Sequence, residues 1–293
     1  MWTFAAAWKP SMNTPNDDAA RRAYWAEQMQ LGYDLAQQMI AFDVRECGEG
    51  FASICDEADE AGVEMLFSDT KIVGDLDRVF YIRKGLVGDV IAIGKAMNER
   101  GWILKIEDGY RSLEMQTRLG RKPDLFDAIL KKCIWENGGE MPDVELVFRR
   151  ALVLIANIPK NGTHMSGSAI DISVFRRDDG SEVWRGKPYL EMSELTPMRS
   201  PFISEQELQN RLDITAMMEA RGFMHFPYEF WHYNKGDALG HILTGLPAPA
   251  RYGAVHWDPT TNTVTAYDDP VSPINPLNVL EKEIAAAMQR AGA

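Results

Sequence analysis

Several long segments carry apolar positions at helical spacing. The first, residues 17–46, follows an Asp-rich start that can cap a helix. Ser204 and Glu207 form an S-x-x-E capping box, which predicts a helix running to Arg221 with Gly222 as its stop. The same period predicts four more helices, at 87–100, 123–136, 144–156 and about 277–290. The apolar stripe of the first helix is expected in the core: Tyr24, Met29, Leu31, Leu35, Met39 and Ile40.

Other segments alternate with a period of two or end in turn residues, which favours strands. The segment after Gly101, "WILKIEDGYR", predicts a strand that ends in an Asp-Gly turn. Asp179 and Gly180 mark a hairpin turn within 175–184. Further strands are expected at 78–86, 168–174 and 222–233, and a further hairpin at 254–267. Helices followed by strands with hairpins predict an α+β fold with a mostly antiparallel central sheet flanked by helices.

Charge and composition narrow the class of partner. The chain has 293 residues, a formal net charge of -12 and a pI of about 5.0. Such a surface repels phosphate backbones, so nucleic acid is not an expected partner. The three cysteines have no CxxC spacing and predict unpaired thiols. The apolar start stops at Lys9 without a basic lead, and no apolar run reaches about 18 residues, so we expect a cytoplasmic protein without a signal peptide or membrane span.

The stretch "NGTHMSGSAIDISV" (161–174) places an acid inside a strand-like apolar run. In a strand, Ile170, Ile172 and Val174 share one face, which is expected to be core, and Asp171 lies on the other among small residues. Gly167 permits a sharp turn that would bring His164 back towards Asp171. On this stretch alone, Asp171 could equally cap or pair on a solvent-exposed face.

A second stretch, "YEFWHYNKGD" (228–237), places Glu229 three residues before His232. A hydrolytic zinc site needs three protein ligands and an open position for water. His164, Asp171 and His232 supply such a set, and Glu229 is then available as a general base. In "EDGYRS" (107–112), Arg111 follows a predicted strand end and could hold a developing oxyanion, although a surface ion pair explains it as well.

Together these motifs resemble the VanX-like D-alanyl-D-alanine dipeptidases, within the zinc D,D-peptidases that also include VanY-type carboxypeptidases. The family pattern is roughly S-x-H-x-x-G-x-A-x-D, then E-x-W-H, with an upstream Y-R. Here the corresponding segments are "GTHMSGSAID", "EFWH" and "GYR". The resemblance covers about residues 65–240.

The resemblance implies a compact zinc D,D-peptidase-like fold with one Zn²⁺ per chain. It implies His164, Asp171 and His232 as zinc ligands, Glu229 as general acid and base, and Arg111 as the group that stabilises the transition state. Phe230 and Trp231 would support the metal site. The predicted substrate contacts are Tyr110, Gly162, Ser166, Tyr189, Leu190 and Trp231.

Two positions depart from the family pattern. Gly162 stands where the family has a serine, and Leu190 stands where it has an aspartate that helps to bind the free amino end of the dipeptide. In an extended segment the adjacent Glu191 would point the other way. Both changes remove polar groups that would meet an ammonium group, so we expect a substrate with a blocked or non-peptide amino side. The first interpretation remains a zinc metallopeptidase that cleaves an amide or peptide bond in a small D-amino-acid substrate, of the D-alanyl-D-alanine dipeptidase type. A D,D-carboxypeptidase, an amidase and a non-catalytic zinc-binding module are the alternatives.

The remaining segments carry weaker predictions. We expect an N-terminal helical extension at 1–60, a catalytic domain at 61–245 and a C-terminal hairpin and helix at 246–293, which could cover the cleft, mediate a homodimer or add stability. His225 is expected to be structural, and no role is assigned to His241 or His256. The expected partner is a small dipeptide-like or amide substrate.

Overall fold

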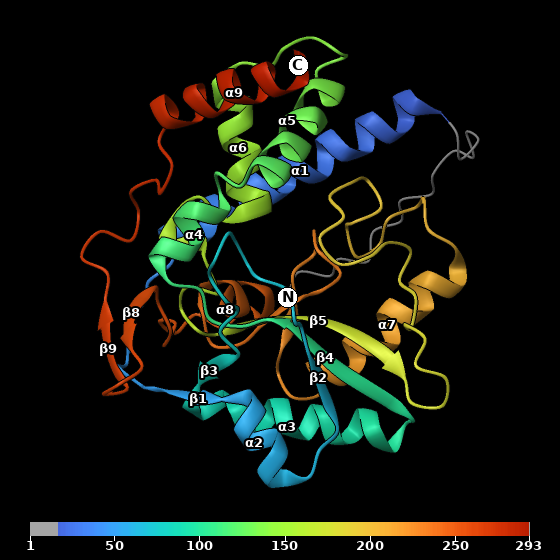
Figure 1. Cartoon of the computed structure of the whole chain (residues 1–293), viewed down its shortest axis with the longest axis vertical. Helices are drawn as coiled ribbons and strands as arrows, with labels where there is room; N and C mark the ends of the chain where they lie inside the picture. The colour runs from blue at the N-terminus through green and yellow to red at the C-terminus, as the bar shows by residue number, and fades with distance from the viewer. Residues whose placement is uncertain (1–16, 293) are drawn as a thin grey trace.

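The computed structural model describes residues 17–292, so the N-terminal segment used for the signal-peptide prediction lies outside the described residues. Figure 1 shows a central sheet with one group of helices on each side. None of the helices in the described part combines the length and the apolar character needed to cross a bilayer.

The central sheet has five strands, and three of its four pairings are antiparallel. Its spatial order is β2 (Met65–Phe67), β4 (Trp102–Asp108), β5 (Ala169–Arg176), β7 (His232–Asn234) and β6 (Met224–His225). Only β2 and β4 run parallel. The α+β class and the mostly antiparallel sheet predicted from the sequence are therefore confirmed.

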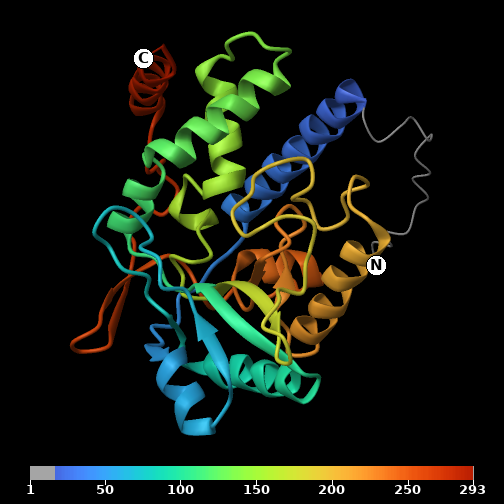
Figure 2. The ribbon, with the colours of Figure 1, turned by 45° about the vertical axis from the view of Figure 1, so that its right-hand side comes forward.

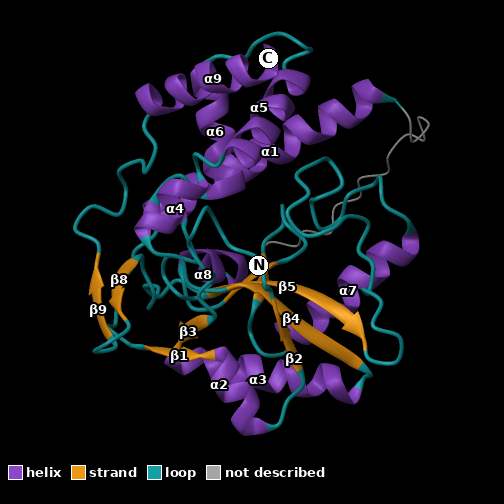
Figure 3. Cartoon of the chain, viewed as in Figure 1, coloured by secondary structure: helices purple, strands orange, loops and turns teal. Residues whose placement is uncertain are grey.

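One face of the sheet packs against α2 (Ile54–Ala61), α3 (Lys84–Glu99) and α7 (Glu205–Glu219). In Figure 3, α2 and α3 lie below the sheet and α7 lies at its right. Their apolar side chains bury a continuous core with the sheet. The capping box at Ser204 is present: its hydroxyl accepts from the Glu207 amide, and the Glu207 carboxylate accepts from the Ser204 amide. The core includes Val90, Met97, Leu104, Ile106, Ile170, Ile172, Val174, Ile214 and Met218.

A second group of helices lies over the opposite face, as the turned view in Figure 2 shows. Helices α1 (Asp18–Ala41), α5 (Pro123–Glu136), α6 (Val144–Ile155) and α9 (Leu277–Gly292) pack on one another through their own apolar cluster, and α4 (Leu113–Leu119) follows β4. Thus α1 and α9, which come from the two predicted extensions, both contact α5 and α6. The division into three segments stays a prediction.

Shorter elements complete the chain. Strands β1 (Phe51–Ser53) and β3 (Tyr81–Arg83) form a separate antiparallel pair, and β8 (Val255–Asp258) with β9 (Thr263–Ala266) forms the predicted C-terminal hairpin. Beside them lie a short 3₁₀ helix, η1 (Pro159–Asn161), and α8 (Ala238–Thr244).

Several predicted elements need correction. The strand expected at 78–86 is shorter and consists only of β3, because α3 already begins at Lys84. It pairs with β1 and lies outside the central sheet. The strand expected at 222–233 is two strands joined by a turn. Leu31 is 46% exposed, since the buried face of α1 is set by Trp25 and Gly32 instead. The three cysteines are free, as expected.

Candidate metal and catalytic site

A row of polar side chains crosses three neighbouring strands on the sheet face opposite the core. In the register of the sheet, Asp108 of β4 lies opposite Asp171 of β5, and Asp171 lies opposite His232 of β7. A β-bulge between Ile106 and Asp108 shifts the register, so Asp108 rather than Glu107 faces Asp171. Backbone pairing therefore places these three side chains together.

The predicted glycine turn brings His164 to this row. Gly167 has φ +68°, and a β-carbon there would lie 2.0 Å from the Phe51 ring, so only glycine fits. Gly109 is needed for a different reason, because a β-carbon there would lie 2.5 Å from the carbonyl oxygen of Val79. The carbonyl of Gly109 lies 2.7 Å from His164 Nδ1, which fixes the imidazole ring against the end of β4.

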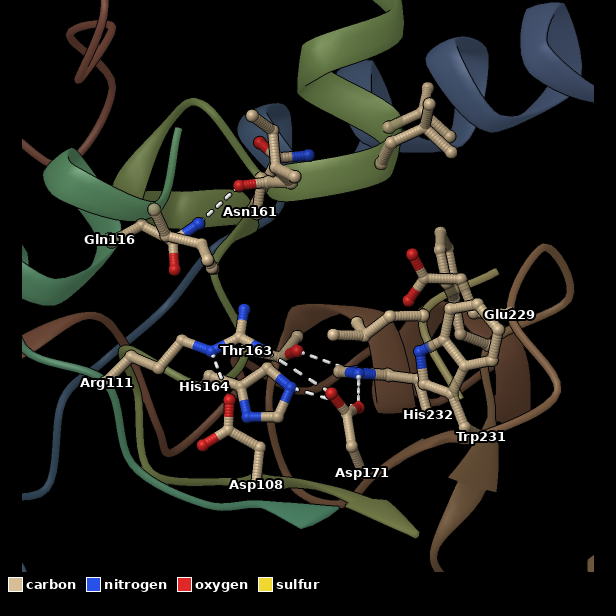
Figure 4. A pocket seen from close by; sticks show the side chains of 18 of the residues that line it. Asp108, Arg111, Gln116, Asn161, Thr163, His164, Asp171, Glu229, Trp231 and His232 are labelled. Atoms are coloured by element: carbon tan, nitrogen blue, oxygen red, sulfur yellow. Dashed lines mark hydrogen bonds and ion pairs between the residues drawn. The ribbon is translucent and has the colours of Figure 1, made fainter. Parts of the chain in front are cut away.

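The two imidazoles converge on one oxygen of Asp171 (Figure 4). His164 Nε2 lies 3.2 Å and His232 Nδ1 lies 2.9 Å from Asp171 Oδ1. The three ligand atoms lie within 4.8 Å of one another, and all three residues are buried. A tetrahedral zinc site with bonds of about 2 Å has ligand separations of about 3.3 Å. The spacing of these donors is therefore close to what zinc requires.

In each of the three side chains, the polar atom that faces away from the shared centre is held by a hydrogen bond. Thr163 Oγ1 lies 2.8 Å from His232 Nε2, and Gly109 holds His164 Nδ1. The Tyr189 hydroxyl donates to Asp171 Oδ2 over 3.0 Å. Such outer partners orient metal ligands and select the histidine tautomer. Each imidazole keeps one nitrogen for a metal, so these residues fit a zinc ion.

The electrostatics of the triad favour a charged Asp171 carboxylate and a neutral His232 imidazole. Burial alone would raise the pKa of Asp171, but the neighbouring His164 and His232 outweigh it and hold that pKa well below its usual range. Burial lowers the pKa of His232, and its hydrogen bond to Asp171 only partly offsets this. Two neutral imidazoles and one carboxylate are the protonation states that a divalent cation needs.

Glu229 lies beside the triad without joining it. It sits in the turn between β6 and β7, where its carbonyl accepts from the His232 amide over 3.2 Å. Burial, and then the charge of Asp171, raise the pKa of Glu229 well above its usual value. A carboxyl with a raised pKa can exchange a proton near neutral pH, which is what a general acid and base must do. Figure 4 shows its carboxyl group at the side of the pocket, next to Trp231.

Arg111 reaches the site from the chain that follows β4. Its Nε donates to Asp108 Oδ2 over 2.7 Å and its Nη2 donates to Asp171 Oδ2 over 3.3 Å. Burial would lower the pKa of Arg111, but Asp108 and Asp171 raise it, so the guanidinium stays charged. The alternative of a surface ion pair is excluded, because Arg111 is buried against both acids.

The triad, Arg111 and Glu229 line one pocket, whose other wall comes from α1 and α6. Gly32, Ala36 and Met39 of α1 contribute to this wall, so the predicted N-terminal extension does line the cleft. Leu152, Val153, Leu154 and Ile155 of α6 add further apolar surface. Asp171 is 2% exposed and in contact with His164, His232, Arg111 and Tyr189, which excludes the solvent-exposed alternative.

Of the predicted substrate contacts, Gly162, Tyr189, Leu190 and Trp231 line this pocket. A β-carbon at Gly162 would lie 2.9 Å from Met165 Sδ, so a serine there would require Met165 to move. Leu190 lies in a turn rather than in the extended segment we expected, with φ +65°, and it is 40% exposed. Glu191 pairs with Lys187 instead.

Two predicted contacts are corrected by their surroundings. The Tyr110 hydroxyl donates to the Val255 carbonyl over 2.9 Å and its ring packs on Phe51, outside the pocket. The Ser166 hydroxyl donates to the Thr163 carbonyl over 2.7 Å and braces the metal loop from behind. For Tyr110, adjacency to Arg111 in sequence is a misleading signal, because neighbouring side chains on an extended chain point to opposite sides.

Phe230 and Trp231, the two aromatic residues between Glu229 and His232, lie in different environments. Trp231 packs edge-on against Tyr189 at the site, as expected of a supporting group. Phe230 instead lies beneath the guanidinium groups of Arg185 and Arg211, away from the triad. His225 pairs with Glu219 over 2.7 Å, His241 contacts the Ala248 carbonyl, and His256 packs on Tyr267.

Sequence reasoning missed several residues of the site. Thr163 stands directly before His164, and Asp108 had been interpreted only as part of a turn. Arg78 lines the pocket from the loop before β3 and had no motif to reveal it. Their contribution depends on strand register and loop packing, which spacing along the chain does not encode.

With this geometry in place, comparison with known families shows what the chain is similar to. Residues 140–254 match the profile of the peptidase family M15, described as D-ala-D-ala dipeptidase. The matched region contains both motifs, with His164, Asp171, Glu229 and His232. Arg111 lies outside it. The resemblance inferred from the motifs is thereby confirmed.

Two individual proteins are also similar to this chain. Over 140 residues, the chain is 28% identical to a D-alanyl-D-alanine dipeptidase of Enterococcus faecalis (strain ATCC 700802 / V583), covering 47% of this chain and 64% of that protein. Over 104 residues it is 33% identical to a D-alanyl-D-alanine dipeptidase of Enterococcus faecium, covering 36% of this chain and 48% of that protein. The matches thus span about half to two thirds of the length of these relatives.

One solved structure, that of the LdcB LD-carboxypeptidase, aligns with 64% of this chain and 72% of its own, at 18% identity and a TM-score of 0.34.

Proposed function

We propose that this protein is a zinc-dependent hydrolase that cleaves an amide bond in a small D-amino-acid substrate, most simply as a dipeptidase of the D-alanyl-D-alanine type. The observation that carries the proposal is the placement of Glu229 and Arg111 in the same pocket as a buried donor set of two histidines and one aspartate. A site that only held a metal would need neither Glu229 nor Arg111.

His164, Asp171 and His232 would hold the zinc ion. Zinc, when bound, supplies Lewis acidity, which makes water a better nucleophile at neutral pH and polarises a carbonyl group. Glu229 takes the proton from the attacking water and returns it to the leaving amine, which its raised pKa favours. Arg111 offers its charge to the oxygen that becomes negative in the transition state, while Asp108 keeps its guanidinium in place.

The alternative is the same chemistry on an N-blocked or non-peptide substrate, as in a D,D-carboxypeptidase or an amidase. The acids that line the described pocket are Asp108, Asp171 and Glu229. The first two are paired with Arg111, and the third is needed for proton transfer. No acid is then left to meet a substrate ammonium group, which supports the blocked substrate. Free D-alanyl-D-alanine assayed beside its N-acetyl derivative separates the two, and a clear preference for the free dipeptide would rule out the alternative.

The proposal is tested most directly at Glu229. We expect Glu229→Ala to keep its zinc content and to lose about 100- to 10,000-fold in kcat, the usual contribution of a general acid and base. Zinc is measured by atomic emission and turnover by amine release from dipeptides and N-acyl dipeptides. Glu191→Gln is the matched control, because Glu191 lies next to the pocket rim and pairs with Lys187. Near wild-type turnover in Glu229→Ala would refute the assignment.

A further inference from the structure

We propose that Arg78 binds an anionic group of the substrate, specifically a carboxylate, and so determines which end of the substrate enters the pocket first. The identity of the substrate rests on the proposed function, but the presence of an anion site does not. Arg78 belongs to neither motif that defines the metal site, and it lies outside the region that matches the family profile.

The backbone places Arg78 beside Arg111. Val79 and Tyr110 form an isolated antiparallel bridge, so the residues that flank them on the pocket side are neighbours. The Arg78 side chain is only 6% exposed, and it lines the same pocket as the triad. Its Nε donates to the Thr70 carbonyl over 3.1 Å, which anchors the guanidinium from behind.

The charge of Arg78 is only partly compensated. Its Nη1 lies 3.4 Å from Asp108 Oδ2, but the same oxygen already accepts from Arg111 Nε over 2.7 Å. Asp108 is the only acid within ion-pair distance of Arg78 in the described part of the chain, and Arg78 Nη2 has no hydrogen-bond partner there. A buried cation that shares its counter-ion is costly, and an incoming anion offsets this cost.

The surroundings of Arg78 favour a carboxylate over other groups. A planar guanidinium presents donors that match a planar carboxylate, and the Tyr189 ring lies 5.8 Å from the Arg78 guanidinium carbon. Lys122, at the start of α5, also lines the pocket and has no ion pair among the described residues. The pocket lining thus carries three cations, Arg78, Arg111 and Lys122, beside the acids Asp108, Asp171 and Glu229, whereas the wall from α1 and α6 is apolar.

A binding experiment tests this assignment without relying on turnover. The zinc-loaded Glu229→Gln protein is titrated by calorimetry with N-acetyl-D-alanyl-D-alanine and with its C-terminal amide. We expect the acid to bind about 10- to 100-fold more tightly than the amide, as for hydrogen bonds to a charged group. Adding Arg78→Gln should bring this ratio close to 1 by weakening the acid alone, and Arg78→Lys should restore part of it. Arg118→Gln is the matched control, because Arg118 pairs with Asp75 of the same loop from the outside.

The outcomes separate this inference from the proposed function. An acid-to-amide ratio that survives Arg78→Gln, or an equal loss of affinity for both ligands, would show that Arg78 only supports the loop and would overturn the inference. Failure of both ligands to bind also counts against it. If the acid binds through Arg78 but the zinc-loaded wild-type protein hydrolyses neither ligand, the anion site stands and the proposed function fails.

Discussion

The two faces of strand β5 are both buried, but one is apolar and the other is polar. On one face, Ile170, Ile172 and Val174 pack against α3 and α7 in an apolar core. On the other, Asp171 lies among the histidines, beneath the pocket that α1 and α6 cover. The first face gains stability from removing apolar surface from water. The second excludes water around charged groups, and it is here that the proposed chemistry takes place.

This contrast shows that burial has two uses in one strand. An apolar side chain that loses its contacts lowers the free energy of unfolding, whereas a polar side chain at the site can change with effects confined to metal binding. Substitutions on the two faces should therefore separate stability from function. One substitution on each face and one at an outer partner of a metal ligand sharpen the comparison.

The largest effect is expected for Asp171→Asn. The change keeps the size of the side chain but removes the charge that both imidazoles face, so zinc affinity should fall by more than about 100-fold, beyond the loss typical of an outer partner. Zinc added to the wild-type protein should raise its melting temperature, because a ligand that binds only the folded state stabilises it. The variant should show no such rise, and a wild-type response in the variant would contradict the ligand role.

Ile172→Ala tests the opposite face of the same strand. The side chain is fully buried, so its truncation should lower the free energy of unfolding by about 2–5 kcal/mol. Urea denaturation of the metal-free protein measures this loss. Zinc affinity, measured where the variant is still folded, should match that of the wild type. A large loss of zinc affinity would show that the two faces are coupled.

The smallest of the three effects is expected for Thr163→Val, which preserves shape but removes the hydroxyl that holds His232 Nε2. Zinc affinity should fall by about 10- to 100-fold, as is typical when an outer partner of a metal ligand is lost. Competition with a chromophoric chelator gives the affinity. Thr163→Ser retains the hydroxyl and should stay close to the wild type; equal losses in both variants would instead implicate the methyl group.

The sequence could predict those parts of the site that follow from local spacing. The glycine between His164 and Asp171 allows a turn that brings these two ligands together. The spacing of three residues from Glu229 to His232 places the acid beside the third ligand, in a short hairpin. Thr163, Asp108 and Arg78 could not be predicted in this way. Their positions depend on the β-bulge in β4 and on the loop before β3, where residues distant in sequence meet.

The same limit applies to the fold. Long helices with clear periodicity, such as α1 and α7, were predicted within a few residues, whereas the short α2, α4 and α8 were not, because one or two turns carry too few apolar positions to show a period. Alternation along β5 correctly separated its two faces, but it could not show that α1 and α6 cover the polar one. That depends on how two separate helices fold back over the sheet.

The left-handed backbone of Leu190 has a consequence for how the pocket could change under selection. A leucine in this conformation costs about 1–2 kcal/mol relative to glycine, and its side chain, which is 40% exposed, lines the pocket. Most routes to a wider active site sacrifice stability, since they remove packed groups. Replacing Leu190 by glycine would relax the backbone and remove a side chain from the pocket lining at once, so at this position the relief of backbone strain would offset part of the stability lost with a packed group.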